Sequence, residues 1–174
     1  MIKVEATGIK DLASIHRMEV LGQEFPFDSG LISTYLMGEG RKFAYVATIS
    51  SRPVGSILGH ADRDDPNDVG IVIDHLTVHP LFRNNGVSRK LLKRLNDDSR
   101  KIDIAKDGAH LKVRAMRLLV PSYLVDDKDD PLNIENWLWK MGFKAISSGD
   151  HGCFRYCKNW ESYVFEKLID VETP

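Results

Sequence analysis

The sequence predicts an α/β (α+β) fold in which a mixed central sheet of roughly seven strands carries four helices, in the order βααβββαβαββ. Apolar residues alternate or run continuously over strand-length segments, and between these segments they recur at helical intervals. The stretch Asp74–Leu95, DHLTVHPLFRNNGVSRKLLKRL, passes from a strand through a glycine-containing loop into a helix. With 174 residues, of which 43% are apolar, the chain suits a single domain spanning residues 1–174.

The first half of the chain is predicted to supply a strand, a pair of helices and then a run of strands. These elements are a strand at 1–7, helices at 11–20 and 28–37, and strands at 43–49, 54–61 and 69–78. Asp28 provides an N-cap for the second helix, and Ser50–Pro53 provides a hairpin turn. Strand 69–78 is nearly continuous in apolar residues, so we expect it to be buried on both faces at the centre of the sheet.

The helix that follows the loop is amphipathic. One of its faces is basic, and its apolar stripe consists of Val87, Leu91, Leu92 and Leu95. We expect this helix to continue past Arg100 until Gly108 ends it. The remaining predicted elements are a strand at 113–120, a helix at 132–141 closed by Gly142, and strands at 143–146 and 160–169.

The loop between Pro80 and the helix has the features of a phosphate-binding cradle. The first backbone N–H groups of a helix lack intrahelical partners and lie at the positive end of its dipole. Gly86 allows the backbone to approach a ligand closely, and Arg83 adds a planar, positively charged donor group. The patterns GxxxxGK[ST] and GxGxxG are absent, which excludes two common nucleotide-binding loops. The alternative is an ordinary strand–turn–helix in which Gly86 only permits the turn.

The stretch LTVHPLFRNNGVSRKLL resembles the acyl-CoA-binding signature of the GNAT superfamily of N-acetyltransferases. That signature reads apolar-x-Val-x-Pro-x-x-(Arg/Gln)-x-x-Gly-x-(Gly/Ala) before an amphipathic helix, and the residues that match it are Leu76, Val78, Pro80, Arg83 and Gly86. Ser88 departs from the pattern, because Gly or Ala is usual there, but serine is also small. The segment LWKMGF, residues 138–143, resembles the helix-to-strand junction of the family, and the order of elements is that of a GNAT fold.

The resemblance implies that acetyl-CoA is bound as a cosubstrate between strands 69–78 and 113–120, which part next to the loop. The backbone of the first strand would pair with the pantetheine arm, and an N–H near Val78 would polarise the thioester carbonyl. Asn133 would contact CoA from the start of the last helix, although helix capping explains it equally well. The cosubstrate-binding residues implied in this way are Leu76, Thr77, Val78, Arg83, Asn84, Asn85, Gly86, Val87, Ser88 and Asn133.

Attack on the thioester requires a neutral amine, so a general base is expected beside the cradle. By resemblance, this base lies on the strand about nine to eleven positions before the Arg or Gln of the cradle, which corresponds to Val72 and Asp74. Valine cannot accept a proton, so Asp74 is the candidate base, acting directly or through a bridging water. The alternative is a structural Asp74 that pairs with Arg114 or Arg117.

Two histidines and one tyrosine complete the list of catalytic candidates. His60 on the preceding strand is a further base candidate. Strand alternation predicts that His75 points to the face opposite Asp74 and packs there, unless an irregularity of the strand reverses its direction. In the family the general acid is a tyrosine at the position that Leu138 occupies here. Tyr123, just past strand 113–120, is the candidate substitute, and its alternative role is that of a flexible loop residue.

Phe25, Pro26 and Phe27 are the candidate substrate-binding residues. They lie between the first two predicted helices, where the family builds part of its acceptor site. A Phe-Pro pair there resembles the peptide-binding loop of some protein N-terminal acetyltransferases. The alternative is an apolar plug at a helix break.

Charge and cysteine content narrow the range of partners. The formal net charge is −1, which gives no electrostatic reason to expect nucleic acid or an anionic membrane as a partner. The N-terminus lacks a signal-peptide core, and no apolar stretch has the length of a membrane span. Cys153 and Cys157 are interpreted as reduced thiols rather than metal ligands. We therefore expect a cytoplasmic protein without a metal, and its association as a homodimer stays open.

The sequence thus favours an acetyl-CoA-dependent N-acetyltransferase that transfers its acetyl group directly to a primary amine. The acceptor would be a protein or peptide amine or a small polyamine-like molecule. The rival hypothesis is a noncatalytic acyl-CoA-binding or protein-interaction module with a degenerate site. Leu138 in place of tyrosine favours the rival, and the intact Arg83–Gly86 loop is compatible with both.

Overall fold

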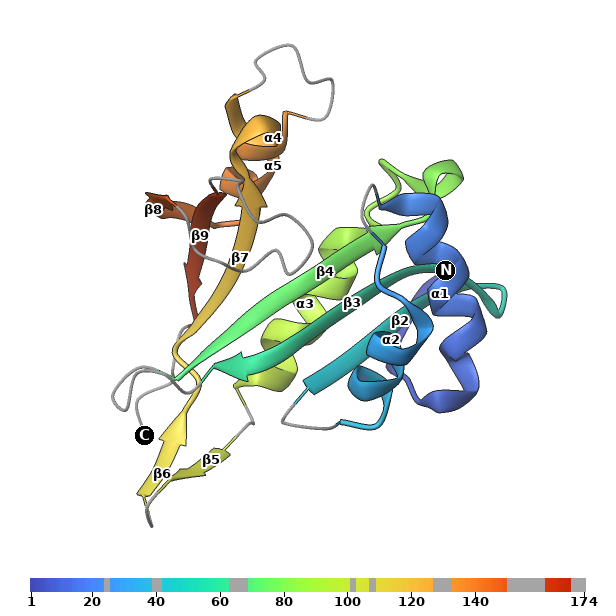
Figure 1. Ribbon diagram of the computed structural model, residues 1–174, viewed down its shortest axis with the longest axis horizontal. Helices are drawn as coiled ribbons and strands as arrows, with labels where there is room; N and C mark the ends of the chain where they lie inside the picture. The colour runs from blue at the N-terminus through green and yellow to red at the C-terminus, as the bar shows by residue number, and fades with distance from the viewer. Residues whose placement is uncertain are drawn as a thin grey trace.

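The computed structural model describes residues 1–23, 26–38, 42–62, 69–100, 103–106, 109–126, 133–149 and 162–169. Its centre is a seven-stranded sheet in the order β1-β2-β3-β4-β7-β9-β8 (Figure 1). The strands are β1 (Ile2–Ala6), β2 (Lys42–Ile49), β3 (Arg52–Asp62), β4 (Gly70–Val78), β7 (Ala115–Pro121), β8 (Lys144–Gly149) and β9 (Ser162–Leu168). β4 and β7 run parallel and the other neighbours antiparallel, so the predicted mixed sheet is confirmed.

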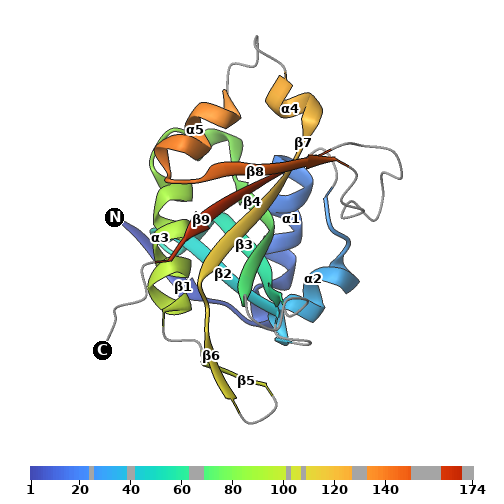
Figure 2. The same ribbon diagram turned by 90° about the vertical axis from the view of Figure 1, so that its left-hand side faces the viewer.

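Helices cover both faces of this sheet. The helices are α1 (Leu12–Gly22), α2 (Ser29–Leu36), α3 (Val87–Ser99), α4 (Ser122–Asp126) and α5 (Ile134–Lys140), with short 3₁₀ turns η1 (Ile9–Asp11) and η3 (Pro80–Phe82). Figure 2 shows α1 and α2 on one side of the sheet and α3 and α5 on the other. The α/β fold class is confirmed, and the described chain has one short helix, α4, beyond the predicted set.

Two apolar clusters hold the helices to the sheet. On the α3 side, Leu91 and Leu95 are fully buried with Ile71 and Ile73 of β4. On the other side, Ile15 of α1 belongs to a second cluster with residues of α2, β2 and β3. Each fully buried side chain of this size contributes about 1.5–3 kcal/mol relative to an exposed one. The central strand is therefore packed on both faces, as its apolar run predicts.

The prediction that the third helix continues past Arg100 is wrong. α3 ends at Ser99, whose buried hydroxyl donates to the Leu95 carbonyl at 2.6 Å. Antiparallel strands β5 (Asp103–Lys106) and β6 (Ala109–Lys112) follow, and this hairpin projects away from the rest of the fold (Figures 1 and 2). The sequence places Asp-Gly between the two strands, a pair that strongly favours a two-residue hairpin turn, and this local signal outweighs the helical pattern.

Candidate active site

The parallel pairing of β4 with β7 stops halfway along β4. The two strands are in register from Gly70 with Ala115 to Ile73 with Leu118, and β4 then continues to Val78 without further pairing to β7. Figure 1 shows the two strands diverging from this point toward their C-terminal ends. Backbone groups along the edges of diverging strands are available to an extended ligand, which can add itself as a strand.

A β-bulge lies at the same point of β4. In the pairing with β3, Leu58 is opposite His75 and Gly59 is opposite Ile73, so Asp74 is the extra residue. As a result, Asp74 and His75 both point to the face that α1 and α2 cover: Asp74 contacts His60 of β3, and His75 contacts Glu19 of α1. The expectation that His75 points away from Asp74 is wrong, because the bulge breaks the alternation.

Asp74 is paired with a histidine. Nδ1 of His60 lies 2.7 Å from Oδ2 of Asp74, and the two side chains are 37% and 20% exposed. A purely structural Asp74 was expected to pair with Arg114 or Arg117. In the structure, Nε of Arg117 donates a 2.9 Å hydrogen bond to Glu166. The candidate base therefore forms an acid–imidazole pair that solvent reaches.

A second acid–imidazole pair lies beside the first. Glu19 is fully buried, its Oε2 contacts Nδ1 of His75, and its Oε1 accepts a 2.6 Å hydrogen bond from the Thr77 hydroxyl. The side-chain amide of Gln23 donates to the Thr77 hydroxyl at 2.7 Å and to the Leu76 carbonyl at 3.3 Å. Periodicity alone does not predict this cluster. Its one sequence signal is the acid Glu19 on the inward stripe of the first helix, because a buried carboxylate needs bonded partners.

The C-terminal end of α1 packs closely against the C-terminal end of β4. A Cβ on Gly22 would lie 2.6 Å from Cγ2 of Thr77, so only glycine lets the two backbones approach this closely. Arg83 bridges the same two elements, donating from Nη2 to the Gly22 carbonyl at 3.2 Å and from Nε to the Val78 carbonyl at 3.4 Å. Arg83 thus joins the end of α1 to the end of β4.

The start of α3 has the geometry of an anion site. Gly86 is its N-cap with φ +75°, in the left-handed region, and no heavy atom lies within 4 Å of the position that a Cβ would take. The first bond closing the helix runs from the Lys90 N–H to the Gly86 carbonyl at 3.1 Å, which leaves the N–H groups of the first turn outside the helical pattern. These donors and the helix dipole suit the diphosphate of CoA.

The profile of the family described as "Acetyltransferase (GNAT) domain" matches residues 23–125, more than half of the chain. The chain belongs to the GNAT acetyltransferase family. The matched range includes the diverging strands, the bulge and the start of α3. Membership assigns the chain to the acetyltransferases that use acetyl-CoA as cosubstrate.

Solved structures of GNAT enzymes share this fold. The ribosomal-protein-S18-alanine N-acetyltransferase of Escherichia coli is 15% identical, with a TM-score of 0.72 over 97% of this chain and 94% of that chain. NAA60 of Arabidopsis thaliana, in complex with acetyl-CoA, is 17% identical, with a TM-score of 0.73 over 97% and 99%. Ard1 of Thermoplasma volcanium is 17% identical, with a TM-score of 0.70 over 97% of both chains. A search of curated protein sequences finds no significant match.

The remaining predicted residues of this GNAT chain lie around the diverging strands. Tyr123 is in α4, directly after β7, and is 39% exposed, so it lies in a helix rather than a flexible loop. Leu138, at the position of the family tyrosine, is fully buried in the α3-side core. Asn133 caps α5, its side chain accepting the Asn136 N–H at 3.1 Å. Phe27 stacks on His75 with ring centroids 3.6 Å apart.

Some predictions fall on parts of the chain that the structure leaves undescribed. Phe25 and both cysteines, Cys153 and Cys157, lie outside the described residues. Within the described ranges, no group of three or more His, Cys, Asp or Glu residues is arranged to hold a metal ion. In the same ranges, no helix combines the length and the apolar character needed to cross a membrane.

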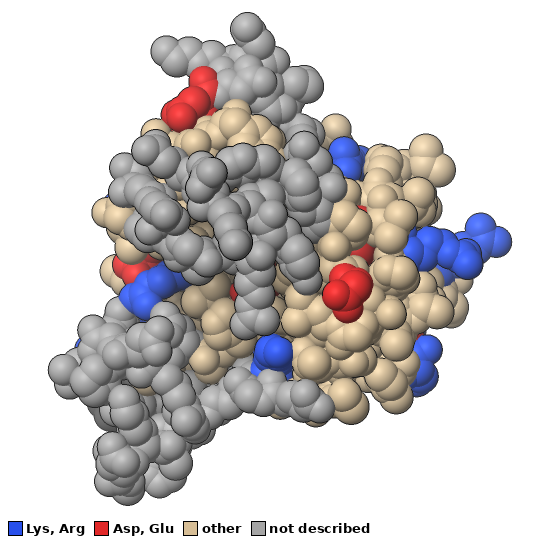
Figure 3. Space-filling view, in the orientation of Figure 1, with Lys and Arg blue, Asp and Glu red and all other residues tan. Residues whose placement is uncertain are grey.

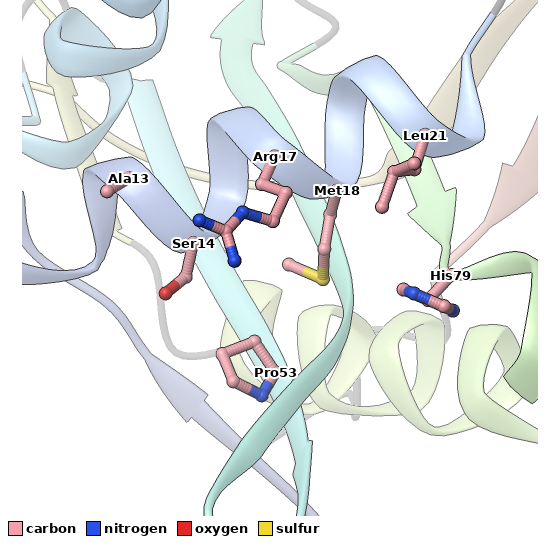
Figure 4. A pocket seen from close by; sticks show the side chains of 7 residues that line it. All are labelled: Ala13, Ser14, Arg17, Met18, Leu21, Pro53 and His79. Carbon is pink, nitrogen blue, oxygen red and sulfur yellow. The ribbon is translucent and has the colours of Figure 1, made fainter.

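A pocket of about 270 Å³ lies between α1, the start of β3 and the residue that follows β4. Figure 4 shows Arg17 and Met18 of α1 above Pro53 and His79, and the other lining residues are Ala13, Ser14 and Leu21. None of the proposed cosubstrate or catalytic residues lines it. On the face drawn in Figure 3, the described acidic and basic side chains form small separate groups of either sign.

Proposed function

We propose that this GNAT enzyme transfers the acetyl group of acetyl-CoA to a primary amine by direct attack of the amine on the thioester. The acceptor is a protein or peptide amine, or a small polyamine-like molecule. The observation that carries the proposal is the coincidence of three features: the end of β4–β7 pairing, the bulge at Asp74 and the free amides at the start of α3. In the proposal, the unpaired strand edge binds the extended arm of the cosubstrate, Asp74 is the base, and the amides bind the diphosphate.

In this proposal the cosubstrate lies along the unpaired edge of β4. The backbone from Leu76 to Val78 pairs with the pantetheine arm, and a backbone N–H near Val78 polarises the carbonyl. The amides of residues 84–88 receive the diphosphate, and Arg83 adds its positive charge from the loop. Asn133 approaches CoA from the start of α5.

Proton removal is the chemical requirement on the acceptor side. For an amine that resembles lysine, forming the neutral amine at pH 7 costs about 4–5 kcal/mol. Asp74, paired with His60, is the proposed base, and Tyr123 is the proposed donor of a proton to the leaving thiolate. Pro26 and Phe27 would contact the acceptor, and Phe27 already lies against His75.

A second candidate function rests on Leu138. Because this buried leucine stands where the family has its acid tyrosine, the chain could bind acyl-CoA without transferring the acyl group. The proposed setting in either case is the cytoplasm. Binding of CoA without release of free thiol, over a broad pH range and a panel of amines, would favour the noncatalytic function.

Replacing Asp74 by Asn separates catalysis from binding. We expect Asp74→Asn to lower kcat by about 100-fold or more, because a positioned base contributes about 10²–10⁴-fold, while CoA affinity stays within about twofold. Thiol release with an amine panel gives the rate, and calorimetry gives the affinity. Asp97→Asn, on the exposed face of α3 and paired with Lys93, is the matched control and should leave both unchanged. Equal loss of rate and affinity in Asp74→Asn, or no loss, contradicts the assignment.

A further inference from the structure

Acetylation of an amine requires the removal of two protons from one nitrogen. The ammonium loses the first proton to become a nucleophile, and the nitrogen loses the second as the N–C bond forms and the C–S bond breaks. One of these protons ends on the CoA sulfur and the other in solvent. Asp74 accounts for one transfer, so the site needs a route for the other.

We propose that His75, held in position by Glu19, is a second proton acceptor for the amine nitrogen. This inference rests on the proposed acetyl transfer. The bulge at Asp74 brings the two neighbouring side chains to the same face of β4, so that a single nitrogen bound there is within reach of two different bases.

The hydrogen-bond chain behind His75 fixes the direction of every proton in it. Gln23 donates from its amide nitrogen to the Leu76 carbonyl and to the Thr77 hydroxyl, so the hydroxyl oxygen is an acceptor there. The Thr77 hydroxyl proton must then point to Oε1 of Glu19, which makes Glu19 an acceptor. We take Glu19 to be the ionised carboxylate, so that its Oε2 accepts from Nδ1 of His75.

This direction sets the tautomer of His75. With its proton on Nδ1, the neutral imidazole carries its lone pair on Nε2. Within the described part of the chain, no group hydrogen-bonds Nε2, and the His75 side chain remains 15% exposed. In the proposal this nitrogen accepts the proton of the amine, and the buried Glu19 carboxylate stabilises the imidazolium that forms.

The surroundings of His75 fit a place beside the acceptor. Phe27 of the acceptor loop stacks on the imidazole, which fixes the plane of the ring. Asp74 of β4, paired with His60 of β3, lies on the same face of the sheet.

The decisive variants are His75→Gln and Glu19→Gln. We expect His75→Gln to lower kcat by about 100-fold with CoA affinity within about twofold of the wild type, because only proton acceptance is lost. Glu19→Gln should lower kcat as well, since the imidazole loses the carboxylate that orients it and fixes its tautomer. His16→Gln, on α1 outside the site, is the matched control. Rates are divided by the folded fraction measured in thermal unfolding.

A readout independent of activity is the imidazole nitrogen spectrum of the free protein. The proposal expects a protonated Nδ1 and an unprotonated Nε2 for His75 in the wild type, and a loss of this preference in Glu19→Gln. If the wild type transfers the acetyl group and His75→Gln has an unchanged kcat, the role of His75 is wrong while the proposed function stands. A wild type that transfers to no amine contradicts the proposed function, and this inference with it. A His75 protonated at Nε2 in the wild type also overturns the inference.

Discussion

At the scale of single residues, Arg83 has one observed structural role and one proposed role in cosubstrate binding. Its guanidinium is exposed beside the start of α3, where the proposal puts the diphosphate, and it also bridges the carbonyls of Gly22 and Val78. A guanidinium keeps donors free while bonding two carbonyls, because it carries five N–H groups. The same side chain can therefore hold the end of α1 and contact phosphate.

Removing this side chain should weaken cosubstrate binding. We expect Arg83→Ala to lower CoA affinity by about 10-fold or more, since a hydrogen bond to a charged group contributes about 1.5–3 kcal/mol. Calorimetric titration measures the change. Arg52→Ala, at the exposed start of β3, is the control and should bind CoA as the wild type does. An unchanged affinity in Arg83→Ala would refute the assignment of Arg83 to the cosubstrate.

The candidate residues divide into those that local sequence can indicate and those that it cannot. Arg83 and Gly86 stand in a local motif, and the loop and helix around them have the predicted order. Glu19 and His75 are 56 positions apart and meet only through the packing of α1 on β4. A bulge also has no local signature in this strand, so neither the direction of His75 nor its partner follows from alternation.

At the scale of elements, α3 is fixed by its apolar stripe and by a polar cluster on its last turns. Tyr45 of β2 is buried under this helix, and the guanidinium of Arg94 lies 6.0 Å from its ring centre. Burial, followed by a hydrogen bond to Asp98 and its charge, raises the pKa of Tyr45 to about 12. The phenol is therefore harder to ionise in the folded protein than in the unfolded chain.

This shift predicts a loss of stability in alkali. An unfolded tyrosine ionises near pH 10, so between about pH 10 and 12 the folded state binds more protons than the unfolded state, and stability falls as pH rises. Solvent screening limits the loss to at most about 2 kcal/mol. Denaturant unfolding of wild type and Tyr45→Phe from pH 9 to 12 measures it, and the variant should lack this part of the slope. Parallel curves for the two proteins would show that Tyr45 does not contribute.

Element boundaries show where local patterns are sufficient and where they fail. Apolar periodicity places α1, α2 and the strands from β1 to β4 close to their observed bounds. It fails after Ser99, where β5 and β6 pair as antiparallel strands in a run that the pattern predicts to be helical. α4 is a single turn, and so short a helix gives no periodic signal.

At the scale of the whole molecule, the sheet separates two groups of candidate site residues, one on each of its faces. α3, whose start is the proposed diphosphate site, lies on one side, and the acid–imidazole pairs lie on the other, under α1 and α2. The edges of β4 and β7 that diverge after Ile73 are where the two sides meet. The order of elements was predictable, whereas the insertion of β9 between β7 and β8 was not, because strand order depends on pairing between distant segments.

The central claim is that the backbone amides at the start of α3 bind the CoA diphosphate. Calorimetric titration of the wild type with CoA and with pantetheine tests this directly. Pantetheine keeps the thiol arm but lacks the diphosphate. We predict that CoA binds and that pantetheine binds at least about 100-fold more weakly, because it makes none of the charge-assisted contacts to the amides and Arg83. No binding of CoA, or equal affinity for the two compounds, would contradict the account.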